Sequence, residues 1–454
     1  MSKFNIQAVT PEKRIKNFSE VICGLNKKQI IEQAKIFIDH KDAAADKEGC
    51  PLGTDVFAVL ELIAQGNVTG AFAKIKEKNF LPAITGRFCE EPFDEIEACD
   101  KDGYLISIRM IERFLSDTVT IKAPKKVQPK KIENIAVIGS GASGLTAAGD
   151  LALLGHDVTV FEAMHECGGV MRYGIPEFRL SRKALNSDLD YLKSLGVVFK
   201  TSVLIGQTIS YETLKEEFDI IYLSTGAGLS AEMKVPGEQA AGVLYGDDFL
   251  MKINLLQGHK YPKYTTNLLL GEKIVVIGSG NTAVDCARSC ARLGCNVTMA
   301  IRKTEQDLHV KPIHTRFLQE EGVKLECLVN VVEILQNKGR QVYGVKSRRY
   351  DYADLNEDGQ WTLEEVADSD FDIEADNVII ATGHKPNALY AKVFGALKLN
   401  KDGTIWTEKD SSKTSLKNVF VGGNVSDGAG SFMWAMLSAK EAVKEIKEYL
   451  KDRE

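Results

Sequence analysis

The strongest constraint on the fold is an internal repeat: the stretch that starts at Ile138 recurs, in register, at Ile277, 139 residues further on. The first copy reads IGSGASGLTAAGDLALLGHDVTVFEA and the second reads IGSGNTAVDCARSCARLGCNVTMAIRK. In each copy a β-branched run precedes the glycines, a helical stretch follows them, and a second apolar run follows a Leu-Gly pair. The repeat therefore predicts two copies of one βαβ unit.

Each copy carries the glycine pattern of a dinucleotide-binding turn, after strands expected at 134–138 and 273–277. The glycines of the two turns are Gly139, Gly141, Gly144, Gly278 and Gly280, with Ala283 in the sixth place. The first glycine permits the bend, the second lets the backbone approach a pyrophosphate, and the third lets the helix pack on the strand. One such turn is weak evidence, but the whole unit present twice favours two dinucleotide sites over two packing turns.

The residues that follow the second strand of each unit differ in charge. Glu162 ends that strand in the first unit, where a carboxylate accepts hydrogen bonds from a ribose 2′-OH and repels a 2′-phosphate. In the second unit Ile301 takes this place, and Arg302 and Lys303 follow. Two cations suit a 2′-phosphate. The first site thus suits FAD or NAD and the second suits NADP; the alternative for the two cations is a solvated strand end.

Three more segments fit two nucleotide-binding sheets. Two apolar runs end in Thr-Gly: DIIYLSTGAG at 219–228 and NVIIATGHK at 377–385. We expect each run to form a strand whose Thr-Gly end lies beside a bound nucleotide. NVFVGGN at 418–424 precedes a C-terminal helix, whose N-terminus would stabilise negative charge on a reduced flavin. Two sites of unlike chemistry in one chain indicate a nicotinamide and a flavin that exchange hydride.

The remainder of the chain predicts a helical N-terminal domain. Amphipathic stretches at 27–40 and 55–65 are typical of helices, and the lysine- and proline-rich segment 122–132 reads as a linker. The 454 residues suffice for about three domains.

Composition excludes several classes of protein. A net charge of −6 argues against a nucleic-acid binder, which needs a basic face. No apolar run approaches the ~18 residues of a membrane span, and the first residues lack the apolar region of a secretory signal. Nine cysteines are too few, and odd in number, for a disulfide framework. We expect a cytoplasmic protein with reduced thiols that binds neither nucleic acid nor membrane.

The chain resembles the small (β) subunit of NADPH-dependent glutamate synthase and its relatives, including the N-terminal half of dihydropyrimidine dehydrogenase. The resemblance covers nearly the whole chain, and its most specific marks are GRFC at 86–89, GGVMRYGIPEFRL at 168–180, GSGNTAVDCAR at 278–288 and the final VGGNVSDGAGSFMWAM. It implies an α/β fold with two Rossmann-like domains after the helical one, the NADPH domain inserted in the FAD domain. The expected bounds are 1–125 for the helical domain, 131–262 and 385–454 for the FAD domain, and 263–384 for the NADPH domain.

Together, the motifs and the resemblance assign residues to each cofactor. For FAD they are Gly139, Gly141, Ser143, Gly144, Glu162, Gly169, Arg172, Thr225, Gly226, Gly423, Asn424, Gly430 and Ser431. For NADPH they are Gly278, Gly280, Asn281, Thr282, Arg302, Lys303 and Gly383. Hydride transfer between the two cofactors depends on positioning, so no catalytic acid or base is assigned. Asn424 replaces the aspartate of the family, yet its amide can still donate to a flavin oxygen.

The resemblance also raises the question of iron–sulfur clusters, because the family usually carries two four-iron clusters in its N-terminal domain. No cysteine lies between Cys23 and Cys50, so the first cluster is expected to be absent. At the places of the second cluster's ligands stand Cys50, Cys89, Glu95 and Cys99. Carboxylate can ligate iron, so one [4Fe-4S] cluster with a glutamate ligand is one interpretation, and three relict thiols are the other.

Other motifs carry less weight. Residues 354–365 match a calcium-binding loop, but their strand-like flanks favour a surface hairpin. Cys286 and Cys290 are expected to be packed on a helix, Cys167 is expected to be structural, and Trp434 to lie in the core or against the flavin.

Three functions compete at this point. The chain could deliver electrons to a larger partner subunit, or act as a stand-alone reductase of small acceptors such as disulfides, ferric iron, quinones or nitro compounds. A third possibility is a nucleotide-sensing protein without turnover. Loss of a cluster favours the stand-alone reductase over the subunit, because the relay to a partner is shortened. The sequence names neither the acceptor nor the oligomeric state.

Overall fold

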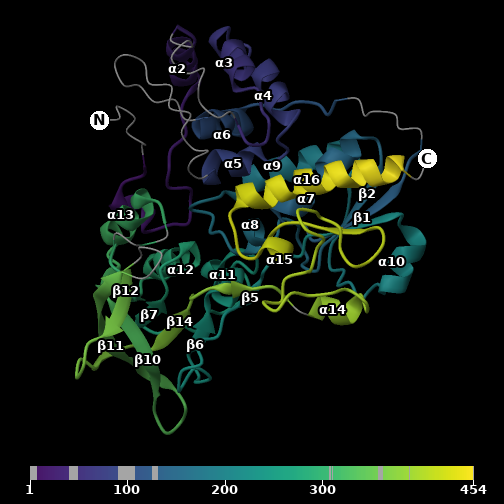
Figure 1. Cartoon of the computed structure of the whole chain (residues 1–454). Helices are drawn as coiled ribbons and strands as arrows, with labels where there is room; N and C mark the ends of the chain where they lie inside the picture. The colour runs from purple at the N-terminus through teal and green to yellow at the C-terminus, as the bar shows by residue number, and fades with distance from the viewer. Residues whose placement is uncertain are drawn as a thin grey trace.

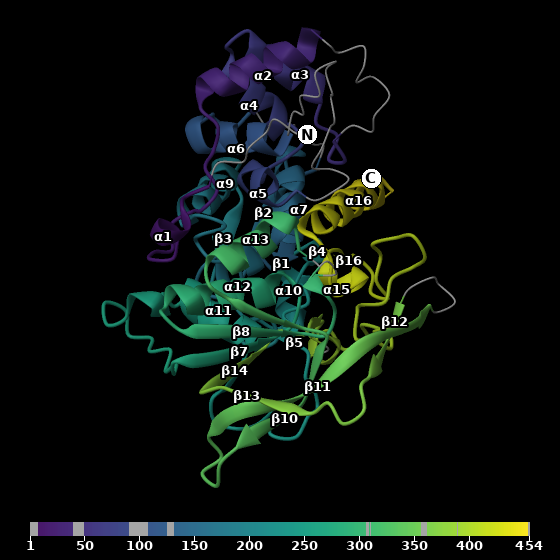
Figure 2. The same cartoon turned by 90° about the vertical axis from the view of Figure 1, so that its left-hand side faces the viewer.

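The computed structural model describes residues 8–39, 50–89, 108–124, 131–305, 308, 310–355, 361–387 and 389–452. Helices of the N-terminal domain lie at one end of the molecule and an antiparallel sheet lies at the other, with two parallel-sheet domains between them (Figure 1). The view turned by 90° gives the same order (Figure 2). We call each glycine turn and the start of the helix after it a cradle; the first begins at Gly139 and the second at Gly278. The α/β fold with two such cradles, expected from the repeat, is confirmed.

The N-terminal domain consists of short helices around an apolar core. Its helices are α2 (Lys27–Asp39), α3 (Val56–Ala64), α4 (Val68–Lys76), α5 (Pro82–Phe88) and α6 (Ile108–Thr118). The short helix α1 (Pro11–Arg14) lies apart from them, and its Arg14 pairs with Glu320 and Glu321 at the end of α13 (Pro312–Glu320) (Figure 2). Asp55 and Asn67 cap α3 and α4 by accepting hydrogen bonds from Ala58 N and Gly70 N, at 3.0 and 2.9 Å. Leu60 and Phe72 are buried together in the core that α2, α3, α4 and α6 enclose. The two amphipathic stretches therefore form helices where their periodicity predicts them.

The first parallel sheet has the strand order β16-β4-β1-β2-β3. Its strands are β1 (Asn134–Ile138), β2 (Asp157–Phe161), β3 (Val198–Lys200), β4 (Ile220–Leu223) and β16 (Val419–Val421). The helices of this domain are α7 (Ala142–Leu153), α8 (Val170–Tyr173), α9 (Arg182–Ser194), α10 (Tyr211–Glu217), α14 (Leu389–Val393), α15 (Asn424–Asp427) and α16 (Phe432–Lys451). The long helix α16 packs along α7 (Figure 1). The domain is thus completed by the C-terminal end of the chain.

The second parallel sheet repeats the first, in the order β6-β14-β7-β8-β9. Its strands are β6 (Val243–Tyr245), β7 (Lys273–Ile277), β8 (Asn296–Ile301), β9 (Lys324–Cys327) and β14 (Asn377–Ile380). The helices beside it are α11 (Gly246–Asn254), the 3-10 turn η2 (Gly258–Lys260), α12 (Asn281–Arg292) and α13 (Pro312–Glu320). Ile138 pairs with Phe161 in one sheet, and Ile277 pairs with Ala300 in the other. Both pairings shift by 139 residues, so the repeat in sequence is a repeat in strand register.

A smaller antiparallel sheet covers one face of the second parallel sheet. It consists of β10 (Val329–Gln336), β11 (Val342–Leu355), β12 (Trp361–Glu365) and β13 (Phe371–Glu374). Val331 and Val345 from this sheet share a core with Val275 and Ile277 from β7. Strands β11 and β12 form the antiparallel hairpin that was expected in place of a calcium loop, although 356–360 lie outside the described residues.

Two extended connections cross between the parallel sheets and pair with each other. They are β5 (Leu229–Ser230) and β15 (His384–Lys385), and Ser230 lies opposite His384. The predicted bound at 262 assigned 243–245 to the FAD domain, but β6 pairs with β14 in the second sheet. The chain therefore crosses between the domains at β5. The sequence gives little sign of this, because β6 is only three residues long.

Two further expectations can be compared with the structure. Trp434 is 61% exposed, so a place in the protein core is wrong for it, and packing against a flavin stays a prediction. Among the helices of the described residues, none combines the length and the apolar character needed to cross a membrane.

Candidate functional site

The first cradle has the steric pattern of a pyrophosphate-binding turn. A Cβ atom on Gly139 would lie 2.5 Å from Ser224 O, and one on Gly144 would lie 2.1 Å from Gly139 O, so both positions exclude a side chain. At Gly141, in contrast, no protein atom lies within 4 Å of the place of a Cβ. Gly141 also caps the N-terminus of α7 without a side-chain hydrogen bond. The open space at this glycine and the free N–H groups of the helix fit a phosphate group.

The second cradle repeats this geometry. A Cβ atom on Gly278 would lie 2.2 Å from Ala381 O, whereas the place of a Cβ on Gly280 is open to 4 Å. Ala283 is fully buried at the position of the third glycine. Gly280 caps α12, whose first residues are the predicted ligands Asn281 and Thr282. Both cradles therefore fit the pyrophosphate of a dinucleotide.

Glu162 is held at the edge of the first cradle by hydrogen bonds from the protein. Its Oε2 accepts from the backbone N and the hydroxyl of Ser140, and its Oε1 accepts from Met164 N at 2.9 Å. The side chain is only 7% exposed. These bonds fix the carboxylate at the end of β2, where a further lone pair can accept from a ribose hydroxyl.

The corresponding place in the second cradle is cationic and open. Arg302 is exposed and Lys303 is half-buried directly after β8. Within the described part of the chain, no hydrogen bond or ion pair engages the guanidinium of Arg302 or the ammonium of Lys303. In contrast to Glu162, these charges are free to bind a 2′-phosphate.

The segment 168–180 connects the two cradles. At one end a Cβ on Gly169 would come within 2.8 Å of Gly141 Cα, so this glycine packs directly on the first turn. At the other end Arg179 donates to Asp285 Oδ2 at 2.7 Å and to Asn281 Oδ1 at 3.2 Å, both in the second cradle's helix α12. One short segment therefore sets the position of each cradle relative to the other.

Arg172, predicted to bind FAD, is buried within this segment. Its Nε donates to Cys167 O at 3.0 Å, its Nη2 donates to Asn186 Oδ1, and its Nη1 lies 3.2 Å from Glu166. Burial raises the pKa of Cys167 to about 11, with the carboxylate of Glu162 adding to this rise, so the thiol stays protonated near neutral pH. These contacts hold Arg172 and Cys167 within the turn, and the binding of FAD by Arg172 stays a prediction.

The C-terminal segment closes over the first cradle. Gly423 has a φ of +78°, and a Cβ there would lie 2.9 Å from Ser143 Cβ, so β16 brings this glycine against helix α7. The Ser143 hydroxyl is hydrogen-bonded to the Tyr222 hydroxyl at 2.7 Å. Asn424 Nδ2 donates to Gly430 O at 3.4 Å, and Ser431 caps α16 by accepting from Trp434 N. Ser143, Gly423, Asn424, Gly430 and Ser431 therefore lie together, although they come from distant parts of the chain.

The two Thr-Gly strand ends lie where each sheet meets its crossover strand. Thr225 and Gly226 follow β4, and a Cβ on Gly226 would meet no protein atom within 4 Å. Thr382 and Gly383 follow β14, and Gly383 has a φ of +147°, which favours glycine. Gly383 O also accepts from Ala231 N at 2.9 Å, which ties this turn to the strand that leads into the second domain.

Sequence reasoning missed a polar group at the crossover. Asp247, in the first turn of α11, accepts from the Ser230 hydroxyl at 2.7 Å and lies 2.9 Å from His384 Nε2. The hydrogen bond that His384 donates to Asp247 raises the pKa of His384 above its ordinary value. Burial raises the pKa of nearby Tyr173 as well, and the charges of Asp247 and Glu162 add to this rise. The signal in the sequence was weak, because the three bonded residues lie on three separate short elements.

The proposed cluster ligands are only partly described. Cys89 is buried in the core beneath α7, and half-buried Cys50 packs against the same core. Burial raises the pKa of Cys50, and the Glu112 carboxylate adds to this rise. Glu95 and Cys99 lie outside the described residues, and within those residues no three His, Cys, Asp or Glu side chains form a metal site. Cys286 and Cys290 are fully buried in α12, as expected for packed side chains.

Comparison with known proteins agrees with this geometry. The sequence profile of the pyridine nucleotide-disulphide oxidoreductases matches residues 133–445, and that of dihydropyrimidine dehydrogenase domain II, a 4Fe-4S cluster domain, matches residues 14–123. The NADPH-Fe(3+) oxidoreductase subunit beta of Geobacter sulfurreducens is 30% identical over 96% of this chain and 67% of that protein. The glutamate synthase [NADPH] small chain of Mycobacterium tuberculosis is 29% identical over 88% of this chain and 85% of its own length.

A solved structure supports the same fold. The oxidoreductase FprA of Mycobacterium tuberculosis, in complex with NADPH, superposes with a TM-score of 0.57 at 18% identity. The match covers 71% of this chain and 85% of FprA. The resemblance to glutamate synthase small chains drawn from the motifs is confirmed.

Proposed function

The chain belongs to the pyridine nucleotide-disulphide oxidoreductase family. On that premise we propose which residues bind FAD and which bind NADPH. The protein is an NADPH-dependent flavoprotein oxidoreductase with FAD and NADPH as cofactors. We assign FAD to the cradle of Gly141 and Glu162, and NADPH to the cradle of Gly280, Arg302 and Lys303.

The observation that carries this assignment is the difference between two otherwise equal cradles. Each has an open second glycine at a helix N-terminus, but one is bordered by a hydrogen-bonded carboxylate and the other by an exposed guanidinium. A carboxylate at the ribose disfavours a 2′-phosphate, whereas Arg302 and Lys303 attract one. FAD carries no 2′-phosphate and NADPH carries one, so the charges select opposite cofactors.

The flavin, when bound, supplies the chemistry by accepting a hydride from the nicotinamide and passing its electrons on. The protein's part is positioning. Gly169 on the first cradle and Arg179 on the second fix the distance between the sites. No side chain is required to move a proton in the hydride transfer itself.

For the electron acceptor we propose a partner protein, as the names of the relatives from Geobacter and Mycobacterium suggest. The helical domain, which matches a 4Fe-4S domain, packs on the flavin domain through Lys76 and Asp188, so it is fixed beside the first cradle. A second candidate is a stand-alone reductase of small acceptors, which the glutamate at ligand position 95 favours. Iron and sulfide analysis decides whether Cys50, Cys89, Glu95 and Cys99 hold one cluster.

Purified protein tests the proposal directly. It should be yellow, and NADPH should bleach its 450 nm absorbance faster than NADH does under anaerobic conditions. Copurification with a much larger chain would support the partner, whereas a single small species that reduces ferric or quinone acceptors would support the second candidate. Protein that folds but does not take up flavin would contradict the assignment of both cradles.

A further inference from the structure

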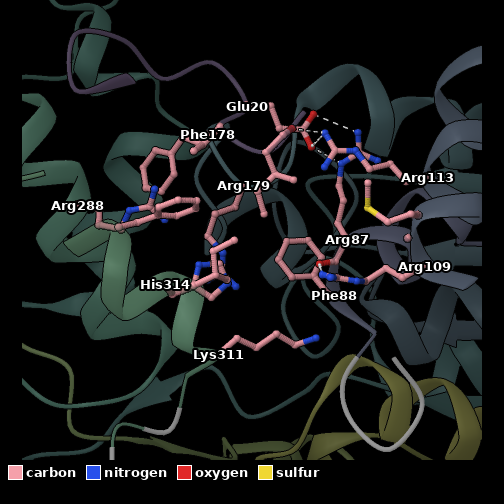
Figure 3. A pocket seen from close by; sticks show the side chains of 16 residues that line it. Glu20, Arg87, Phe88, Arg109, Arg113, Phe178, Arg179, Arg288, Lys311 and His314 are labelled. Carbon is pink, nitrogen blue, oxygen red and sulfur yellow. Dashed lines mark hydrogen bonds and ion pairs between the residues drawn. The ribbon is translucent and has the colours of Figure 1, made fainter. Parts of the chain in front are cut away.

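A cation-lined pocket lies where the helical domain, the 168–180 segment and the second parallel-sheet domain meet (Figure 3). Arg87 and Arg113 line one side of it from α5 and α6, and Arg288 and His314 line the other from α12 and α13. The close approach of α5 to α6 depends on Gly86, where a Cβ would lie 2.5 Å from Arg113 N. The pocket is distinct from both cradles.

The charges that line this pocket are strongly unequal. One carboxylate, Glu20, faces six cations among the lining residues. The six are Arg87, Arg109, Arg113, Arg179, Arg288 and Lys311. Carboxylates behind the wall balance several of them: Asp117 lies 2.9 Å from Arg87, Asp285 lies 2.7 Å from Arg179, and Glu321 lies 2.8 Å from Arg288. The residues that line the pocket therefore include more cations than carboxylates.

Several buried nitrogen atoms in the wall make no hydrogen bond within the described residues. Arg179 Nε and His314 Nδ1 are both shielded from solvent and make no hydrogen bond. Arg179 uses its other two nitrogens on α12, and His314 lies on α13, so the two unpartnered nitrogens come from different domains. The neutral ring of His314 donates from Nδ1 in the tautomer that carries its proton there. Burial and the surrounding cations, Arg179, Arg288, Lys311 and Arg109, lower the pKa of His314. Buried donors without partners are rare in folded proteins, which points to a bound group that accepts from both.

The size of the pocket limits what this group can be. The volume of the pocket that is open to water-sized groups is about 30 Å³. This volume exceeds the ~10–15 Å³ that one water needs, but it is far too small for a nucleotide. The rings of Phe88, Phe178 and Phe317 close the walls between the cations. We propose that the pocket binds one small oxyanion, a phosphate- or carboxylate-type group, through Arg179 and His314. This anion would connect three parts of the chain.

The test uses FAD-loaded protein saturated with NADP⁺, so that both cradles are filled. Sodium phosphate is titrated against sodium chloride at constant ionic strength, and binding is followed by calorimetry and by the midpoint of thermal unfolding. We expect a saturable rise in the midpoint. His314→Phe keeps the ring but removes the donor, and should weaken phosphate binding about tenfold, as the loss of one charge-assisted hydrogen bond predicts.

Matched variants keep the result interpretable. Arg316→Gln removes an exposed cation from the same helix and should bind phosphate like the parent. If His314→Phe unfolds early in chloride alone, Arg179→Lys provides the second test, because it retains charge but lacks Nε. Saturable binding of sulfate would indicate a free tetrahedral anion, and tighter binding of acetate would indicate the carboxylate of an organic acid. Absence of saturable binding, or equal binding in parent and both pocket variants, would overturn the proposal.

This outcome is separate from that of the proposed function. The difference between parent and His314→Phe isolates the pocket even if NADP⁺ fails to bind, since Arg302 and Lys303 are unchanged in both proteins. Conversely, a protein reduced by NADPH but indifferent to phosphate would leave the cofactor assignment intact and remove the anion site.

Discussion

Arg179 and Asp285 form an ion pair of 2.7 Å between the flavin-side segment and the helix of the second cradle. Both side chains are buried, and their residues are 106 positions apart in the chain. Ten residues before Arg179, Gly169 packs on Gly141 of the first cradle. Because this one segment contacts both nucleotide turns, the distance between the cofactors is set by the fold itself. Hydride transfer, which depends on a close and aligned approach, requires such control.

The same substitution should impair FAD binding at one glycine of the first cradle and folding at another. Gly141→Val places its side chain in open space at a φ of −74°, so the apoprotein should fold, but the pyrophosphate place is filled and FAD should be lost. Gly144→Val would put a Cβ 2.1 Å from Gly139 O and should prevent stable folding. Flavin content and the thermal midpoint of the apoproteins distinguish the two. Equal flavin loss with equal loss of stability would contradict a ligand-facing role for Gly141.

Arg302→Ala should change selectivity between the nicotinamide cofactors. Loss of a charge-assisted contact to the 2′-phosphate costs about 1.5–3 kcal/mol, so the KM for NADPH should rise about 10- to 100-fold while the KM for NADH changes little. Arg340→Ala, at another exposed arginine, is the matched control. Steady-state reduction of a dye with both cofactors measures the effect. A similar rise for NADH would refute the assigned role of Arg302.

The sequence could predict whichever features repeat or follow a local pattern. Strands 134–138 and 273–277 lie at the predicted residues, because β-branched runs before glycine turns specify them locally. The crossover at β5 and β15 could not be predicted, since each strand has two residues and is stabilised by its partner from a distant segment. For the same reason the contact of Asp247 with His384, and the pocket around His314, depend on tertiary packing that no short motif encodes.

His384 should make stability depend on pH near neutrality. Its pKa in the folded state is raised above about 6.5 by the hydrogen bond to Asp247. The stabilisation is therefore complete below about pH 6.5 and is lost as pH rises through the folded pKa. His384→Gln should flatten this part of the profile of thermal midpoint against pH. His165→Gln, at an exposed histidine, should retain it, and a profile that His384→Gln leaves unchanged would show that the pair does not titrate in this range.

The buried pair of Lys76 and Asp188 should hold the helical domain on the flavin domain. Lys76 Nζ lies 2.8 Å from Asp188 Oδ1 and also donates to Phe80 O, and both charged side chains are at most 2% exposed. Asp188→Asn leaves a buried ammonium without its counter-charge, which costs about 3–5 kcal/mol in the free energy of unfolding. Denaturant unfolding measures this loss, and limited proteolysis should show whether the helical domain is released first.

Asp190→Asn is the matched control, two residues along the same helix α9. Asp190 pairs with Lys193 at 2.8 Å, but both side chains are more than half exposed, at 66% and 59%. Exposed pairs contribute little because water screens them, so this variant should unfold like the parent. Equal effects of Asp188→Asn and Asp190→Asn would mean that the buried pair does not couple the domains. A large effect of Asp188→Asn alone, with flavin retained, would identify domain docking rather than cofactor binding as its role.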